Sequence, residues 1–150
     1  MKLDLSAKKE QIVFGGDSIV IQKYISGIKG GRTLDMTDYP LKVVKAGSVI
    51  VTKDGVYKPM PLTPKMEGES GSQTEVKDDD GNTVYAYGTL PTGFSYAGVL
   101  YRSIMADKPA ASIMTNGEVN SEAVPYPMDT ISAAFKEACP LISFIKDEEA

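Results

Sequence analysis

Histidine is absent from this chain of 150 residues, and cysteine occurs once, at Cys139. Without histidine, Ser-His-Asp and Cys-His catalysis and histidine-ligated zinc are excluded. A single cysteine cannot form an internal disulfide. The stability of the fold must therefore come from packing or from association with other chains.

Long apolar runs are also missing. No run approaches the roughly 20 residues that cross a bilayer, and the segment from Met1 to Leu5 lacks the apolar core of a signal peptide. We therefore expect no membrane association and synthesis in a cytoplasm.

Positive charge is not in excess. The 16 lysine and arginine residues face 20 acidic residues, which gives a net charge of -4. Nonspecific binding of nucleic acid depends on electrostatic attraction to phosphate, so we expect no nucleic-acid partner.

The composition and length predict one folded domain with an N-terminal extension. Hydrophobic residues make up 42% of the chain and charged residues 24%, as in soluble globular proteins. Residues 1–31 are predicted to be a flexible arm with a strand at Ser18 to Ile25, because glycine pairs lie on both sides of it. Residues 32–150 are predicted to form a single β-rich domain, barrel-like or sandwich-like.

Short apolar runs and turn residues predict hairpins. Asp54-Gly55 lies between the runs Val49–Val51 and Val56–Tyr57, a strong hairpin pattern, and Pro59, Pro61 and Pro64 are expected to end that hairpin. Residues 66–73 are predicted to be a mobile loop. A second hairpin is expected around the acidic tip at residues 78–82.

The C-terminal part predicts one short helix followed by a strand. Ile131, Ala134, Phe135 and Ala138 recur at helical spacing, Asp129 or Thr130 is the expected cap, and Pro140 ends the helix. Leu141 to Ile145 is then expected as a terminal strand. The predicted fold class is mainly β, or α+β with one C-terminal helix.

Four patterns resemble functional sites but favour structural roles. Asp78, Asp79, Asp80 and Asn82 resemble a calcium loop, but the EF-hand spacing places Thr83 where glycine is needed and Thr89 where glutamate is needed. We interpret them as a solvated hairpin tip.

The other patterns also favour structural interpretations. The glycine pairs at residues 15–16 and 30–31 match no phosphate-binding motif and predict turns. Cys139, in an apolar context, predicts a buried small hydrophobe. Asn116-Gly117 predicts a tight turn with positive φ.

Tyrosine is the one residue type that favours a binding surface. Half or more of the tyrosines are expected to be ordinary strand residues, and the remainder are available for carbohydrate or protein contact. The eight tyrosines are Tyr24, Tyr39, Tyr57, Tyr85, Tyr87, Tyr96, Tyr101 and Tyr126.

Five short motifs together resemble a known family. They occur in this order before the helix and the last strand: residues 30–35, 46–50, 54–60, 96–101 and 113–120. The series resembles the tailed-phage head decoration and head-fibre proteins, in particular those of phages and prophages of Bacteroides-type bacteria. The resemblance covers about Gly30 to Glu149.

The resemblance implies a trimeric β-rich protein on the outer surface of a phage capsid, with the major capsid protein and a fibre protein as expected partners. In lambda-type decoration proteins an N-terminal arm engages the shell, and residues 1–31 are its counterpart by analogy. The alternative is a host-surface or glycan-binding module.

No enzyme is expected. Carboxylates are plentiful, but no pair lies in a recognisable site context. We therefore assign no catalytic, cofactor-binding or metal-binding residue.

Overall fold

Three apolar runs form the centre of the molecule, and each is buried on both faces. In the computed structural model, which describes residues 16–146, strand β4 (Val49–Lys53) places Val49 and Val51 in one hydrophobic cluster and Ile50 in a second. Successive side chains of a strand point to opposite faces, so an unbroken apolar run supplies both clusters. The neighbouring strands do the same with Val99 and Leu100 and with Met114 and Ile113.

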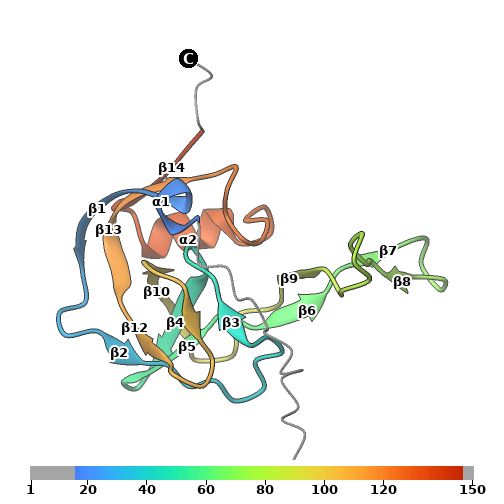
Figure 1. Ribbon diagram of the computed structural model, residues 1–150, viewed down its shortest axis with the longest axis horizontal. Helices are drawn as coiled ribbons and strands as arrows, with labels where there is room; N and C mark the ends of the chain where they lie inside the picture. The colour runs from blue at the N-terminus through green and yellow to red at the C-terminus, as the bar shows by residue number, and fades with distance from the viewer. Residues whose placement is uncertain (1–15, 147–150) are drawn as a thin grey trace, which may run out of the picture.

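These strands lie in one six-stranded sheet (Figure 1). The strand order is β1-β13-β10-β4-β5, and β14 pairs with β13 beside this path. All pairings are antiparallel except that of β13 with β14. Besides β4, the strands are β1 (Ile21–Gly27), β13 (Ile113–Asn120), β10 (Ser95–Leu100), β5 (Val56–Pro59) and β14 (Ile142–Ile145).

Four two-stranded sheets complete the β structure. They pair β2 (Arg32–Thr33) with β12 (Ala110–Ala111), β3 (Val43–Val44) with β11 (Ile104–Met105), β6 (Leu62–Pro64) with β9 (Tyr85–Tyr87), and β7 (Met66–Glu67) with β8 (Thr74–Glu75). Strands account for 42% of the described residues and helices for 8%, which confirms a mainly β fold with a short helix and a terminal strand near the C-terminus.

The predicted Asp54-Gly55 hairpin is confirmed. Asp54 has φ 50° and Gly55 has φ 81°, and β4 and β5 pair on either side of them. Positive φ at both turn residues is the requirement of the type I′ turn, whose twist matches that of the strands. Pro59 ends β5 as expected, and Pro64 is the last residue of the next strand, β6.

The predicted C-terminal helix is α2 (Ser132–Ala138), and it buries Phe135 completely. The expected cap is wrong: Ile131 is the N-cap residue, and no side chain bonds to the helix start. Instead, Phe135 lies edge-to-face against Tyr96 at 5.5 Å and Phe144 at 5.7 Å. Packing against the sheet therefore fixes this short helix, in keeping with the small contribution of local signals to short helices.

The Asn116-Gly117 turn is a wrong prediction. Both residues lie inside β13, where Gly117 is paired with Tyr24 of β1. A Cβ atom on Gly117 would overlap the carbonyl oxygen of Lys23. Glycine is required here for close approach of two strands that are bulged against each other, and not for a turn.

The N-terminal strand belongs to the central sheet. It begins at Ile21, three residues after the expected start, because Asp17–Val20 form the short helix α1, which the sequence did not predict. Asp17 accepts hydrogen bonds from the backbone N–H and the hydroxyl of Ser103, at 2.8 and 2.6 Å. Residues 1–15 of the expected arm lie outside the described residues.

A narrow projection leaves the body of the molecule, and we call residues 62–87 the finger. Figure 1 shows it extending to the right of the sheet, with β6 and β9 at its base and β7 and β8 towards its tip. The bridge between Lys77 and Thr83 confirms the expected turn at the acidic tip. The expected loop at residues 66–73 begins as β7, which pairs with β8, so the finger contains two short ladders.

The first prediction concerns Phe135. Replacing it with alanine should lower the free energy of unfolding by about 3–5 kcal/mol, because a fully buried aromatic side chain is lost and a cavity remains. Urea denaturation measures the change. Glu137→Ala, an exposed position of the same helix, is the control and should shift the midpoint little; equal shifts in both variants would contradict the packing described.

The second prediction concerns Gly117. Gly117→Ala should destabilise the protein by roughly 1–3 kcal/mol, because the new methyl group meets the rigid backbone of β1. Gly16→Ala is the control, since a Cβ there has open space around it. Thermal unfolding followed by circular dichroism compares the two, and an unchanged melting temperature for Gly117→Ala would refute the close approach.

Candidate functional site

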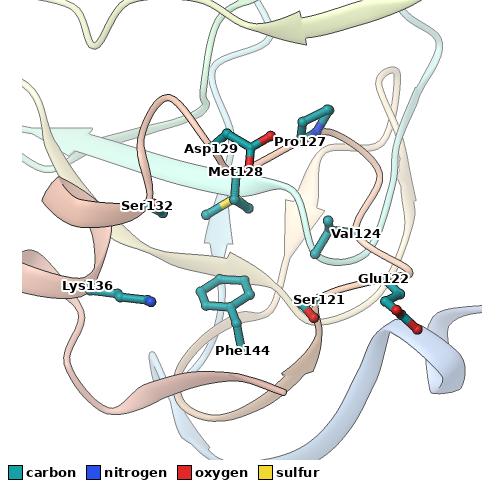
Figure 2. A pocket seen from close by; sticks show the side chains of 9 residues that line it. All are labelled: Ser121, Glu122, Val124, Pro127, Met128, Asp129, Ser132, Lys136 and Phe144. Atoms are coloured by element: carbon teal, nitrogen blue, oxygen red, sulfur yellow. The ribbon is translucent and has the colours of Figure 1, made fainter. Parts of the chain in front are cut away.

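A cleft of about 400 Å³ lies between α2, β14 and the segment that follows β13. Figure 2 shows the ring of Phe144 pointing into it, with Met128 and Val124 on the opposite side. Glu122 and Lys136 lie at opposite ends. The remaining lining residues are Ser121, Pro127, Asp129 and Ser132.

The cleft combines an apolar floor with separated charges. Glu122 forms an ion pair with Lys146 at 3.4 Å, whereas Asp129 and Lys136 form none with residues 16–146. Within the same range, neither Ser121 nor Ser132 donates its hydroxyl to a carboxylate. The cleft suits the binding of a group with an apolar face and polar substituents.

The acidic turn at residues 78–82 is closed by hydrogen bonds among its own residues. The Asp78 carboxylate accepts hydrogen bonds from the backbone N–H groups of Asn82 and Asp80, at 2.8 and 3.0 Å. These bonds, chiefly that from Asn82, lower the pKa of the Asp78 carboxyl. In the described part of the chain, no three histidine, cysteine or acidic residues are grouped to hold a metal ion.

The tyrosines are mainly structural. Tyr87 and Tyr126 are buried and pack edge-to-face at 5.3 Å. Tyr24 is the one tyrosine in the described residues that is prominently exposed, at 43%, and its ring lies 4.5 Å from that of Tyr101. The prediction that half or more of the tyrosines serve the fold is consistent with this distribution.

Tyr87 stabilises the start of the central strand β4. Its hydroxyl accepts the backbone N–H of Val49 at 3.0 Å, in a buried position. The hydroxyls of Tyr39 and Tyr126 are buried without a hydrogen bond of standard geometry, although the two groups interact electrostatically. Burial raises the pKa of all three tyrosines, so they stay neutral at physiological pH.

Cys139 is buried, as predicted, with 7% of its surface exposed. Burial raises the pKa of its thiol, and its sulfur lies 3.7 Å from the carbonyl oxygen of Tyr96. Both features disfavour the reactive thiolate. Gly30 and Gly31 form a turn after β1, and Gly15 lies outside the described residues.

Sequence reasoning missed the cleft. Its helix and strand were predicted, but the segment from Ser121 to Asp129 carries no periodic pattern, and only its prolines indicate an irregular path. The convergence of this segment on Phe144 depends on the parallel pairing of β14 with β13, which joins distant parts of the chain.

Comparison with known proteins adds no relative: no family model, no curated protein and no solved structure matches the chain. Across residues 16–146, no helix has the length and apolar character needed to span a bilayer.

A pair of tyrosine variants tests the hydroxyl assignments. Tyr87→Phe should cost about 1–3 kcal/mol of stability, because the N–H of Val49 is left buried without a partner. Tyr126→Phe removes a hydroxyl that makes no hydrogen bond of standard geometry and only interacts with the Tyr39 hydroxyl, so it should cost less than Tyr87→Phe. Denaturant unfolding measures the free energy of unfolding of both variants. A larger decrease for Tyr126→Phe than for Tyr87→Phe would contradict the hydrogen bonding described for the two hydroxyls.

Proposed function

We propose that this chain is a virion structural protein that decorates or stabilises the outer surface of a phage capsid, or forms the base of a head fibre. The motif series from Gly30 onward supports this proposal through its resemblance to head decoration and head-fibre proteins. The expected partners are the major capsid protein, further copies of the chain in a homotrimer, and a fibre protein.

The observation that carries the proposal is the contrast between the body and the finger. The body has two hydrophobic clusters around a central sheet, whereas residues 63–75 are exposed without exception. Isolated two-stranded ladders are marginally stable in water, so a projection of this kind is suited to contact with another molecule. A rigid body that presents such a projection suits a protein that acts by attachment.

The site chemistry supports the same class of function. Within residues 16–146, Ser121 and Ser132 of the cleft donate no hydrogen bond to a carboxylate, and the thiol of Cys139 is buried. A role on the outside of the capsid also suits a net charge of -4, because packaged DNA would repel an acidic surface. Synthesis in the bacterial host cytoplasm precedes assembly in this proposal.

Immunogold electron microscopy of intact virions tests the proposal. Antibodies against the chain should label the outer surface of virions from a phage that encodes it, and a gene deletion should remove the label. The deletion virions should also lose their genomes at a lower temperature if the chain stabilises the shell. Label that appears only after the capsids are disrupted would overturn the proposal.

A second candidate function is the binding of host glycans, which the cleft favours. Sugars present an apolar face and hydroxyl groups, and the cleft offers the Phe144 ring together with Asp129 and Ser132. A glycan array should then show binding that Asp129→Asn weakens, with Glu137→Gln as the exposed control. An array without signal above background removes this candidate.

A further inference from the structure

The net charge of the chain is confined to the finger. Residues 62–87 contain six carboxylates and two lysines, so the finger carries -4, which equals the net charge of the whole chain. The remainder of the chain is therefore balanced. The six carboxylates are Glu67, Glu69, Glu75, Asp78, Asp79 and Asp80.

Local ion pairs leave the turn at residues 78–82 of the finger acidic. Lys77 pairs with Glu75 at 3.1 Å and Lys65 approaches Glu67 to 4.0 Å. Asp79 and Asp80 have no cation beside them among the residues that the structure describes, and both are exposed. The turn at residues 78–82 thus presents uncompensated negative charge to solvent.

The opposite side of the molecule carries positive charge, and we call this region the basic edge. Lys23, Lys29 and Arg32 are exposed, and the stretch from residue 18 to residue 32 contains no carboxylate. Arg102 adds a fourth charge beside Ser18 and Ile21, although the Asp17 carboxylate lines the same surface depression and offsets part of it. Glu118 of β13 lies opposite Lys23 in the ladder and offsets part of this charge.

Within the basic edge, Lys23 lies on β1, the border strand of the central sheet, whereas the guanidinium of Arg32 in β2 lies 5.6 Å from the Tyr57 ring of β5. β1 pairs with β13 on one side, and no strand within residues 16–146 pairs with its other side. Ile25 is 53% exposed there, and Tyr24 is similarly exposed. An exposed strand edge with apolar side chains is a surface on which another chain segment can dock.

We propose that the finger of one copy docks on the basic edge of a second copy of this chain. Charge complementarity selects this occupant: the finger carries the negative charge and the edge carries the positive charge. Figure 1 shows β1 and the finger on opposite sides of the body, so one molecule cannot satisfy both surfaces by folding on itself. The contact is therefore head-to-tail.

A head-to-tail contact also supports the finger. Its two short ladders have little apolar burial of their own, and Met66 is 44% exposed on β7. Docking against Tyr24 and Ile25 would cover apolar surface on both partners. Repeated contacts of this kind close into a ring when the rotation between copies permits, and otherwise extend into a filament.

This inference rests on the self-association included in the proposed function, and it assigns the surfaces. Sedimentation velocity of the purified full chain over a range of concentrations tests it. The wild type should form a discrete oligomer that weakens as salt is raised, because exposed charges are screened. The edge variant, Lys23→Glu with Lys29→Glu, and the finger variant, Asp79→Lys with Asp80→Lys, should each raise the dissociation constant by roughly tenfold or more.

The decisive sample combines all four substitutions in one chain. It restores opposite charge on the two surfaces and should recover association, whereas an effect of misfolding would not be rescued. Lys53→Glu with Lys45→Glu, exposed positions outside both surfaces, is the matched control and should associate like the wild type. Circular dichroism verifies that every variant is folded.

Two results would overturn the inference. One is a wild-type chain that stays monomeric at every concentration. The other is a dissociation constant of the edge and finger variants that equals that of the wild type. Either result is distinguishable from failure of the capsid role, because virion labelling does not depend on self-association in solution. A chain that labels virions but remains monomeric would keep the proposed function and remove this contact.

Discussion

Burial of the three central strands on both faces is the constraint on which the rest of the fold depends. Because β4, β10 and β13 are apolar on each side, both faces of the sheet must be covered. Phe135 and Tyr126 contribute to the cover on one face, while Leu34 and Val44 contribute on the other. The short helix and the irregular connections are therefore required by the sheet, and their own local stability is secondary.

The parts of this fold that the sequence predicts are those decided by neighbouring residues. Asp54-Gly55 forms its turn because both positive φ angles are available within two adjacent residues. The spacing of Ile131, Phe135 and Ala138 likewise predicts α2 within one or two residues of its observed ends. In both cases the competing conformations are excluded locally, so no distant partner has to be known.

Asn116-Gly117 shows why other parts cannot be predicted in this way. The same dipeptide that favours a turn also suits a strand when a second backbone comes close to the glycine. The backbone in question belongs to β1, more than 80 residues earlier in the chain. The cleft has the same origin, since Phe144 reaches the segment after β13 only through the parallel pairing of β14. Pairing between strands far apart in the chain determines both the strand conformation of Asn116-Gly117 and the formation of the cleft. Such pairing produces no pattern in the neighbouring sequence.

The distribution of stability within the molecule connects this fold to its function. Apart from Tyr87 at the base of the finger, the buried core side chains belong to the body. The finger contributes charge but little apolar burial, and it therefore gains most from any surface that meets it. The acidic finger and β1, whose outer edge pairs with no strand within residues 16–146, lie on opposite sides of the body. Such a separation of charge has its physical effect between molecules, where it orients an approaching partner before contact is made.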